Sequence, residues 1–164
     1  MRSFHPTTVL FPCVLAAACG GGSGAPEATT TPSGPAGDTF VPFESSPTHA
    51  LAISEDGTQL FVANAVGGRL SVFDLGEPAA PVLTREVPVG LEPVSVASRT
   101  SGEVWVANQL SDTVSVVDVD AGRVAATLAV GDQPSDIAFA AGRAFVTAAT
   151  EDRVVVFDIA TRAL

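Results

Sequence analysis

Three polar side chains stand where a ligand could be bound. Asn64 and Asn108 close the similar strings "FVAN" and "WVAN", and His49 is the only histidine beyond the first few residues. Amide and imidazole groups donate and accept hydrogen bonds, and a neutral imidazole also binds metal ions. Asparagine also commonly bonds to the backbone of a nearby loop. Two interpretations stay open: loop support by the two asparagines, or contact of all three side chains with a ligand.

The sequence carries no recognisable catalytic or cofactor motif. It has no Gly-x-Ser-x-Gly string, no phosphate-binding loop and no cysteine pair. One histidine cannot supply a usual metal set, and Asp118-Val119-Asp120 is too short for a calcium loop. Asp74, Asp118 and Asp158 recur once per repeat, which favours a cap on a turn over catalysis. We therefore expect no catalytic residue, no cofactor and no metal site.

Composition and charge narrow the class of protein. The chain has 164 residues, of which 46% are hydrophobic and 16% are charged. It is too apolar for a disordered chain, and its length allows about one domain. The formal net charge is -10, and the eight basic residues are scattered along the chain. Nucleic acid and anionic membrane surfaces would repel such a chain, so neither is an expected partner.

The N-terminal residues 1–18, "MRSFHPTTVLFPCVLAAA", have the pattern of a secretory signal. The string Leu15-Ala16-Ala17-Ala18-Cys19 resembles a bacterial lipoprotein signal, in which cleavage precedes a cysteine that is then acylated. It departs from the commonest pattern because Leu15 lies four places before the cysteine rather than three. The resemblance implies a lipid bilayer anchor at Cys19 and a place in the bacterial cell envelope, on its periplasmic or outer-surface face. The alternative is an ordinary secretory signal followed by an incidental cysteine.

A linker separates the signal from the folded part. Residues 19–37, which begin with the lipidated Cys19, are almost all Gly, Ser, Thr, Ala and Pro. They cannot bury enough apolar surface to fold, so we predict a disordered tether. The pattern changes at Asp38, and 38–164 is the predicted folded region. Cys13 would leave with the signal, so no internal disulfide is expected.

The folded region is a repeat. Phe61, Trp105 and Phe145 begin similar strings at spacings of 44 and 40 residues, and each unit closes a later strand with aspartate. A period of about 40–45 residues with several short strands is typical of a β-propeller blade. We predict an all-β fold of four-stranded antiparallel blades, with about three blades present as a partial propeller. The predicted parts are an outer strand at 39–46, a blade at 47–90, a blade at 91–131 and a partial blade at 132–164.

Within the unit at 91–131, the predicted strands are 94–97, 103–108, 113–119 and 124–130. The loop between the second and third strands has four residues in every unit. Equal loops between equal strands predict the same register in all three units. Most strands are too apolar for clean alternation, which fits blades covered on both faces by their neighbours.

The units resemble the YVTN-repeat β-propellers, a family of YncE-like proteins named for a Tyr-Val-Thr-Asn strand. The matching residues of the second unit are Pro93, Trp105-Val106-Ala107-Asn108, Val114-Ser115-Val116-Val117-Asp118 and Val130-Gly131. The chain departs from the family in having no tyrosine and in having Ala148 where the third unit should have asparagine. The resemblance implies a propeller fold in an exported bacterial protein and leaves the activity open. WD-repeat propellers match less well, because Trp105 is out of place and no Trp-Asp string occurs.

Three blades are too few to close a ring, since propellers have typically about four to eight. The third unit lacks its fourth strand, whereas "TFVPFESSP" at 39–47 aligns with "REVPVGLEP" at 85–93. Phe40–Phe43 therefore resembles a fourth strand with no unit before it. Three explanations remain: the chain is a piece of a longer propeller, copies assemble into a larger ring, or three blades form an open stack with sticky faces.

A repetitive scaffold without catalytic residues favours a binding or interaction module for an unknown protein or small-molecule ligand. His49 precedes an innermost strand, so it would lie at the mouth of the propeller channel, together with Asn64 and Asn108. The alternative is a fragment of a propeller enzyme, either lactonase-like or a cofactor-dependent dehydrogenase. Its catalytic residues would then lie in blades that this sequence does not contain.

Overall fold

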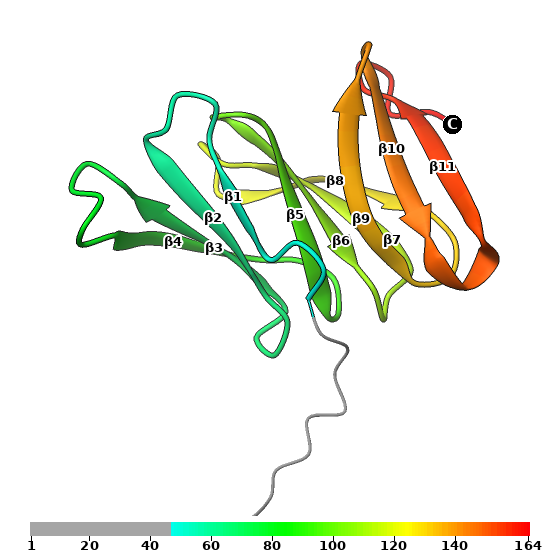
Figure 1. The fold of residues 1–164 in the computed structure, drawn as a ribbon, viewed down its shortest axis with the longest axis horizontal. Coiled ribbons are helices and arrows are strands. Elements are labelled where there is room, and N and C mark those ends of the chain that lie inside the picture. The colour runs from blue at the N-terminus through cyan, green and yellow to red at the C-terminus, as the bar shows by residue number, and fades with distance from the viewer. Residues whose placement is uncertain (1–46) are drawn as a thin grey trace, which may run out of the picture. The chain divides into compact units, whose positions relative to one another are not determined.

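The computed structural model describes residues 47–164, all of which belong to the compact unit Val41–Leu164. The predicted signal, Cys19, the linker at 19–37 and the outer strand at 39–46 lie outside the described residues. The elements follow one another in chain order (Figure 1). They are β1 (Leu51–Ile53), β2 (Gln59–Asn64), β3 (Arg69–Asp74), β4 (Val82–Pro88), β5 (Pro93–Thr100), β6 (Glu103–Asn108), β7 (Thr113–Asp118), β8 (Arg123–Ala129), β9 (Pro134–Ala140), β10 (Arg143–Ala148), the 3-10 turn η1 (Ala149–Glu151) and β11 (Arg153–Asp158).

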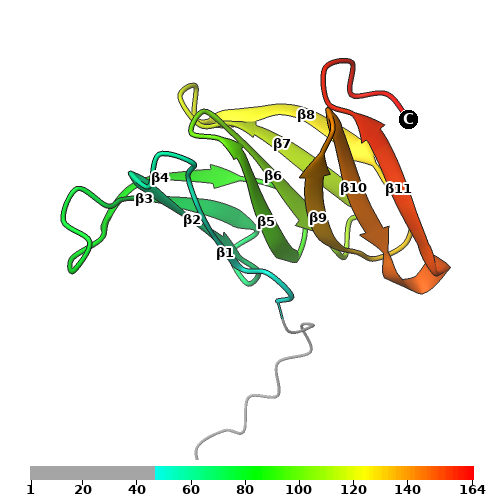
Figure 2. The same ribbon diagram turned by 45° about the horizontal axis from the view of Figure 1, so that its top comes forward.

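The strands form three antiparallel sheets. Within each sheet, the strands pair in the order in which they follow one another in the sequence. We call them blade 1 (β1-β2-β3-β4), blade 2 (β5-β6-β7-β8) and blade 3 (β9-β10-β11). Blade 2 lies between the other two (Figures 1 and 2). The predicted all-β fold of about three propeller blades is confirmed.

The blades share one strand register, as the constant loop length predicted. Equivalent residues pair across the second and third strands of each blade: Phe61 with Val72, Trp105 with Val116, and Phe145 with Val156. The two four-stranded blades also share a register shift between their third and fourth strands, at Val72/Phe73 and Val116/Val117. The sequence repeat is therefore a repeat of backbone hydrogen bonding as well.

Strand β5 is longer than predicted, running from Pro93 to Thr100 rather than over 94–97. Ser98 pairs with Val104, and Thr100 pairs with Glu103, so the connection to β6 is a tight turn. The polar residues that resemble a loop in the sequence continue the strand ladder instead. The outermost strand β8 alternates between exposed and half-buried residues, because it lies at the rim of its blade.

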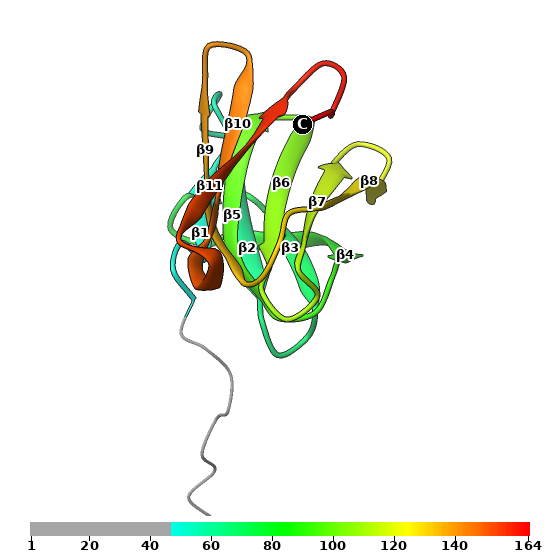
Figure 3. The same cartoon turned by 90° about the vertical axis from the view of Figure 1, so that its right-hand side faces the viewer.

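Apolar contacts between blades form the core. Phe61, Leu70 and Val72 of blade 1 belong to one buried cluster with Val104 and Val117 of blade 2. A second cluster joins blades 2 and 3 around the fully buried Trp105. The Trp105 ring meets Phe139 edge to face at 5.5 Å and Phe157 at 6.4 Å. Figure 3 views the stack from the side of blade 3.

The recurrent aspartates cap the turns after the third strands, as predicted. Each accepts a hydrogen bond from a backbone N–H in the following turn. The three pairs are Asp74 with Gly76 at 2.6 Å, Asp118 with Ala121 at 2.9 Å, and Asp158 with Thr161 at 2.9 Å. The hydrogen bonds that the Thr161 backbone N–H and hydroxyl donate to Asp158 hold the pKa of that carboxyl below its ordinary value.

Replacement of Trp105 should show how much the blade contact contributes. Trp105→Ala should lower the free energy of unfolding by about 3–5 kcal/mol, because it removes a buried ring from between two blades. The measurement is chemical denaturation followed by circular dichroism. Leu110→Ala is the matched control, because Leu110 is 67% exposed; its effect should stay within about 0.5 kcal/mol. Equal losses in the two variants would contradict this account of the core.

Candidate functional site

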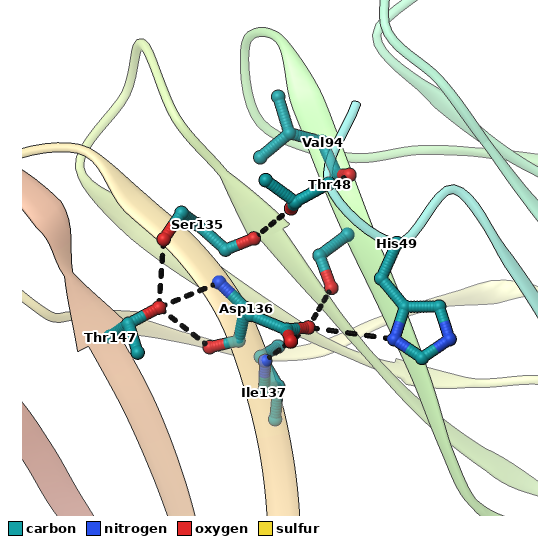
Figure 4. Close-up of polar contacts among 8 residues, drawn as sticks. Thr48, His49, Val94, Ser135, Asp136, Ile137 and Thr147 are labelled. Carbon is teal, nitrogen blue, oxygen red and sulfur yellow. Dashed lines mark hydrogen bonds and ion pairs between the residues drawn. The ribbon is translucent and has the colours of Figure 1, made fainter. Parts of the chain in front are cut away.

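A cluster of polar side chains lies where the inner strands begin. We call it the inner-mouth cluster; it consists of Thr48, His49, Ser95, Ser135, Asp136 and Thr147 (Figure 4). The segment before β1 runs parallel to β5, with a bridge between His49 and Ser95. The backbone N–H groups of Thr48 and His49 donate to the carbonyl of Val94 at 3.0 and 3.2 Å. Backbone pairing therefore positions both side chains on blade 2.

Asp136 is the centre of one half of the cluster. Its Oδ1 accepts hydrogen bonds from the Ser95 hydroxyl at 2.8 Å and from the Ile137 backbone N–H at 2.9 Å. His49 Nδ1 lies 3.6 Å from the same oxygen (Figure 4). Ser95 is fully buried, whereas the His49 and Asp136 side chains are 61% and 51% exposed. A buried hydroxyl thus holds a carboxylate whose outer side a ligand can reach.

Thr147 organises the other half. Its hydroxyl oxygen accepts from the Asp136 backbone N–H at 2.9 Å and lies 2.8 Å from the Ser135 hydroxyl. Thr48 donates its hydroxyl hydrogen to the Ser135 carbonyl. The segment before blade 1 is therefore bonded to both blade 2 and blade 3 at this place.

The arrangement favours recognition through hydrogen bonds over covalent catalysis. A nucleophilic relay needs an imidazole that is hydrogen-bonded to the attacking hydroxyl. Here the His49 imidazole and the Ser95 hydroxyl both contact Asp136 Oδ1 instead. Ser95 also has no exposed surface. Within residues 47–164, no three His, Cys, Asp or Glu side chains gather closely enough to hold a metal ion.

Asn108 is fully buried and bonds to groups outside this cluster. Its Oδ1 accepts from the backbone N–H of Gly90 at 3.1 Å, and its Nδ2 donates to Ser115 at 2.9 Å. A side chain at Gly90 would place its first carbon 2.6 Å from the Asn108 carboxamide carbon, so only glycine fits there. Asn108 thus fastens the connection that leaves blade 1 onto blade 2.

Asn64 is equivalent to Asn108 in sequence but is exposed. Its Oδ1 accepts from the Gly67 backbone N–H at 2.9 Å, within its own loop. The prediction that both amides bond to loop backbone is confirmed. Of the three predicted ligand contacts, His49 lies in the inner-mouth cluster. Its partners Ser95 and Asp136 were missed, because only the fold brings them together.

Blade 3 replaces the missing asparagine with an ion pair that the sequence analysis did not find. Arg153 Nε lies 2.6 Å from Glu151 Oε2. Glu151 accepts from the Asp132 backbone N–H at 3.0 Å, and Arg153 donates to the Val130 carbonyl at 3.3 Å. These two side chains hold the segment that connects blade 2 to blade 3. The connection is therefore fastened even though Ala148 stands where an asparagine would bond to it.

A pocket of about 620 Å³ lies beside the turns after β5, β9 and β11. Glu103 lines it and accepts hydrogen bonds from Trp105 Nε1 at 2.9 Å and Arg99 Nε at 2.7 Å. Burial raises the pKa of Glu103, but these bonds and the charges of Arg99 and Arg162 outweigh it, so the pKa lies below its ordinary value. The pocket's charged groups pair mainly with one another, which favours a structural role.

The two asparagines allow a matched test of the junction. Asn108→Ala should lower the free energy of unfolding by about 1–3 kcal/mol, because it leaves the half-buried Gly90 N–H and the buried Ser115 hydroxyl without their partner. Asn64→Ala removes an exposed loop bond and should cost less than about 1 kcal/mol. Denaturant titration of both variants measures the difference. A loss as large in Asn64→Ala would contradict the assigned roles.

Solved structures with a similar arrangement are β-propeller-like proteins. The hydrazine synthase of Kuenenia stuttgartiensis matches 79% of this chain with a TM-score of 0.65 and 28% identity. A candidate 6-phosphogluconolactonase from Bacteroides uniformis matches 66% with a TM-score of 0.57 and 24% identity. Apo AztD from Citrobacter koseri matches 68% with a TM-score of 0.56 and 18% identity.

The chain spans 38%, 38% and 32% of the lengths of these three proteins, respectively. No protein-family model matches the sequence, and no curated protein matches it. The similarity therefore concerns the fold, and the described part of the chain is a partial β-propeller.

Proposed function

We propose that the chain is a lipid-anchored binding scaffold outside the cytoplasm, with the inner-mouth cluster as its ligand site. One observation carries the proposal: the exposed His49–Asp136 pair is held at the junction of three blades by a buried hydroxyl. Binding sites need polar groups that are fixed before the ligand arrives, and this pair has that support.

The chemistry of the cluster defines the ligand class. Asp136 accepts hydrogen bonds, and His49 donates or accepts them according to its tautomer. The surrounding protein carries a formal net charge of -10, which opposes anionic ligands. The expected ligand is a small uncharged or cationic molecule with hydroxyl or amino groups, or a protein segment that presents such groups.

The proposed location rests on the N-terminal sequence. Acylation of Cys19 would insert lipid chains into a bilayer of the bacterial cell envelope, and residues 19–37 would tether the blades to it. Within residues 47–164, no helix has the length and hydrophobicity needed to cross a bilayer. Attachment through Cys19 is the membrane contact that we propose.

The second candidate is a fragment of a propeller enzyme, either lactonase-like or a cofactor-dependent dehydrogenase. The names of two similar structures, a hydrazine synthase and a candidate 6-phosphogluconolactonase, favour it. This chain spans 38% of each, so further blades of a whole enzyme would hold the catalytic groups. Inner-mouth residues of the present blades would then form one part of the site.

Ligand binding can be tested with the full chain and a panel of small amines, polyols and sugars. Thermal-shift screening should find a compound whose binding weakens at least about tenfold in Asp136→Asn, which removes the carboxylate charge, and in His49→Ala, which removes the imidazole. Glu77→Gln, which changes an exposed turn carboxylate, is the matched control and should bind normally. Unchanged binding in both site variants would exclude the site. Turnover of a phosphorylated sugar lactone in a metal-supplemented assay would support the enzyme instead.

The anchor can be tested by metabolic labelling with an alkyne fatty acid in a bacterial host. The wild-type chain should carry the label and collect in the membrane fraction. Cys19→Ser should lose both properties, because the acyl acceptor is gone. Cys13→Ser should behave as wild type, because that cysteine lies within the predicted signal. An unlabelled, soluble wild-type chain would indicate the ordinary secretory signal.

A further inference from the structure

Blade 3 has an open edge along β11. In blades 1 and 2, the third strand pairs with a fourth, β3 with β4 and β7 with β8. Within residues 47–164, β11 pairs with β10 alone. The N–H of Asp158, at the end of β11, donates to the Ala163 carbonyl, so the open stretch is Arg153–Phe157. Unpaired strand edges of this kind are templates for another strand.

The outer face of blade 3 is also uncovered, although its residues are those that pack elsewhere. Val154 is 55% exposed, whereas its equivalents Leu70 and Val114 are fully buried. Phe145 and Val156 are only half-buried, although they are equivalent to buried pairs in blades 1 and 2. In blades 1 and 2, the equivalent residues are buried because the next blade packs over them. The outer face of blade 3 therefore has the residues of a covered face but no blade over it within residues 47–164.

Blade 1 has the complementary surface on its outer face. A row of cross-strand neighbours runs over all four strands: Ile53, Leu60, Phe73 and Leu83. The equivalent row in blade 2 is Ser98, Val104, Val117 and Val124. Val104 and Val117 lie in the core against blade 1. Blade 2 uses this row to pack against blade 1. The outer face of blade 1 has the same row and could pack in the same way against a blade that precedes it.

The segment at 39–43 has the sequence of the missing strand. In the alignment of 39–47 with 85–93, Val41 corresponds to Val87 of β4, which is buried and pairs with Leu70. Pro42 corresponds to Pro88. In blade 1, the connection from Pro88 to Pro93 joins a fourth strand to the first strand of the next blade. A fourth strand formed by 39–43 would therefore belong to a blade directly before blade 1, and that position is three blades before the blade that contains β11 of the same chain.

We propose that a second copy of this chain docks on blade 3. Its residues 39–43 add antiparallel to β11 as the fourth strand, with Val41 opposite Val154, and its blade 1 covers the outer face of blade 3. Two such contacts between two copies close a ring of six blades, within the range of about four to eight that propellers adopt. The pairing removes both open edges and both bare apolar faces.

Cysteine cross-linking tests the occupant and the register together. In a chain with Cys13→Ser and Cys19→Ser, Val41→Cys in one copy and Val154→Cys in another should form a disulfide under mild oxidation. Directly opposite residues of antiparallel strands lie within disulfide range, about 4.5–5.5 Å between Cα atoms. Phe40→Cys replaces Val41→Cys as the control; it should cross-link at least about tenfold less, because a shift of one residue turns the side chain to the other face.

The outcomes separate the possible occupants. A heterodimer of the two single-cysteine chains supports the proposal. A disulfide that closes within one chain carrying both cysteines, with no intermolecular product, overturns it in favour of the chain's own segment. Equal cross-linking from Phe40→Cys overturns the register.

Oligomeric state gives an independent test in the chain with native residues at 41 and 154. Analytical ultracentrifugation at about 100 μM should show a dimer, which Val154→Asp should convert to monomer by placing a charge in the apolar contact. Leu110→Asp is the control and should stay dimeric, because Leu110 lies on an exposed loop away from the docking face. Val154 is exposed in the single chain, so the variant should fold. A wild-type monomer at this concentration would refute the proposal.

Discussion

The structure depends on one constraint: a single blade cannot bury both of its apolar faces. Each four-stranded sheet must therefore lie between neighbours, and blade 2, which has them, contributes the fully buried Val104, Trp105 and Val117. Face-to-face packing fixes the spacing of the sheets, and the common register places equivalent residues at equivalent heights. Stability is then largely a sum of blades and blade contacts, as in other repeat proteins.

The inner-mouth cluster is a consequence of the same packing. The innermost strands of blades 2 and 3 meet the segment before blade 1 here, so Thr48 bonds to Ser135 and Ser95 bonds to Asp136. Their mutual hydrogen bonds leave the outer side of the His49–Asp136 pair exposed. The scaffold thus creates a polar site from residues that have no motif in common.

The fold could be predicted because its strands repeat in the sequence. The site could be predicted only in part, because its residues do not repeat from blade to blade. Recurrent strings such as that beginning at Trp105 predicted the blades, the equal registers and the caps formed by Asp74, Asp118 and Asp158. Asp136 occurs once, and its link to Ser95 spans 41 residues, so no local pattern could indicate it. The extra length of β5 was missed because its polar end resembles a loop.

The two blade junctions are built from different chemistry. Asn108 joins blades 1 and 2 through a buried neutral amide, whereas Glu151 and Arg153 join blades 2 and 3 through a more exposed ion pair. Mobile ions screen exposed charges but leave buried amide bonds nearly unchanged. Added salt should therefore weaken the Glu151–Arg153 fastening of blade 3 more than the Asn108 fastening of blade 2.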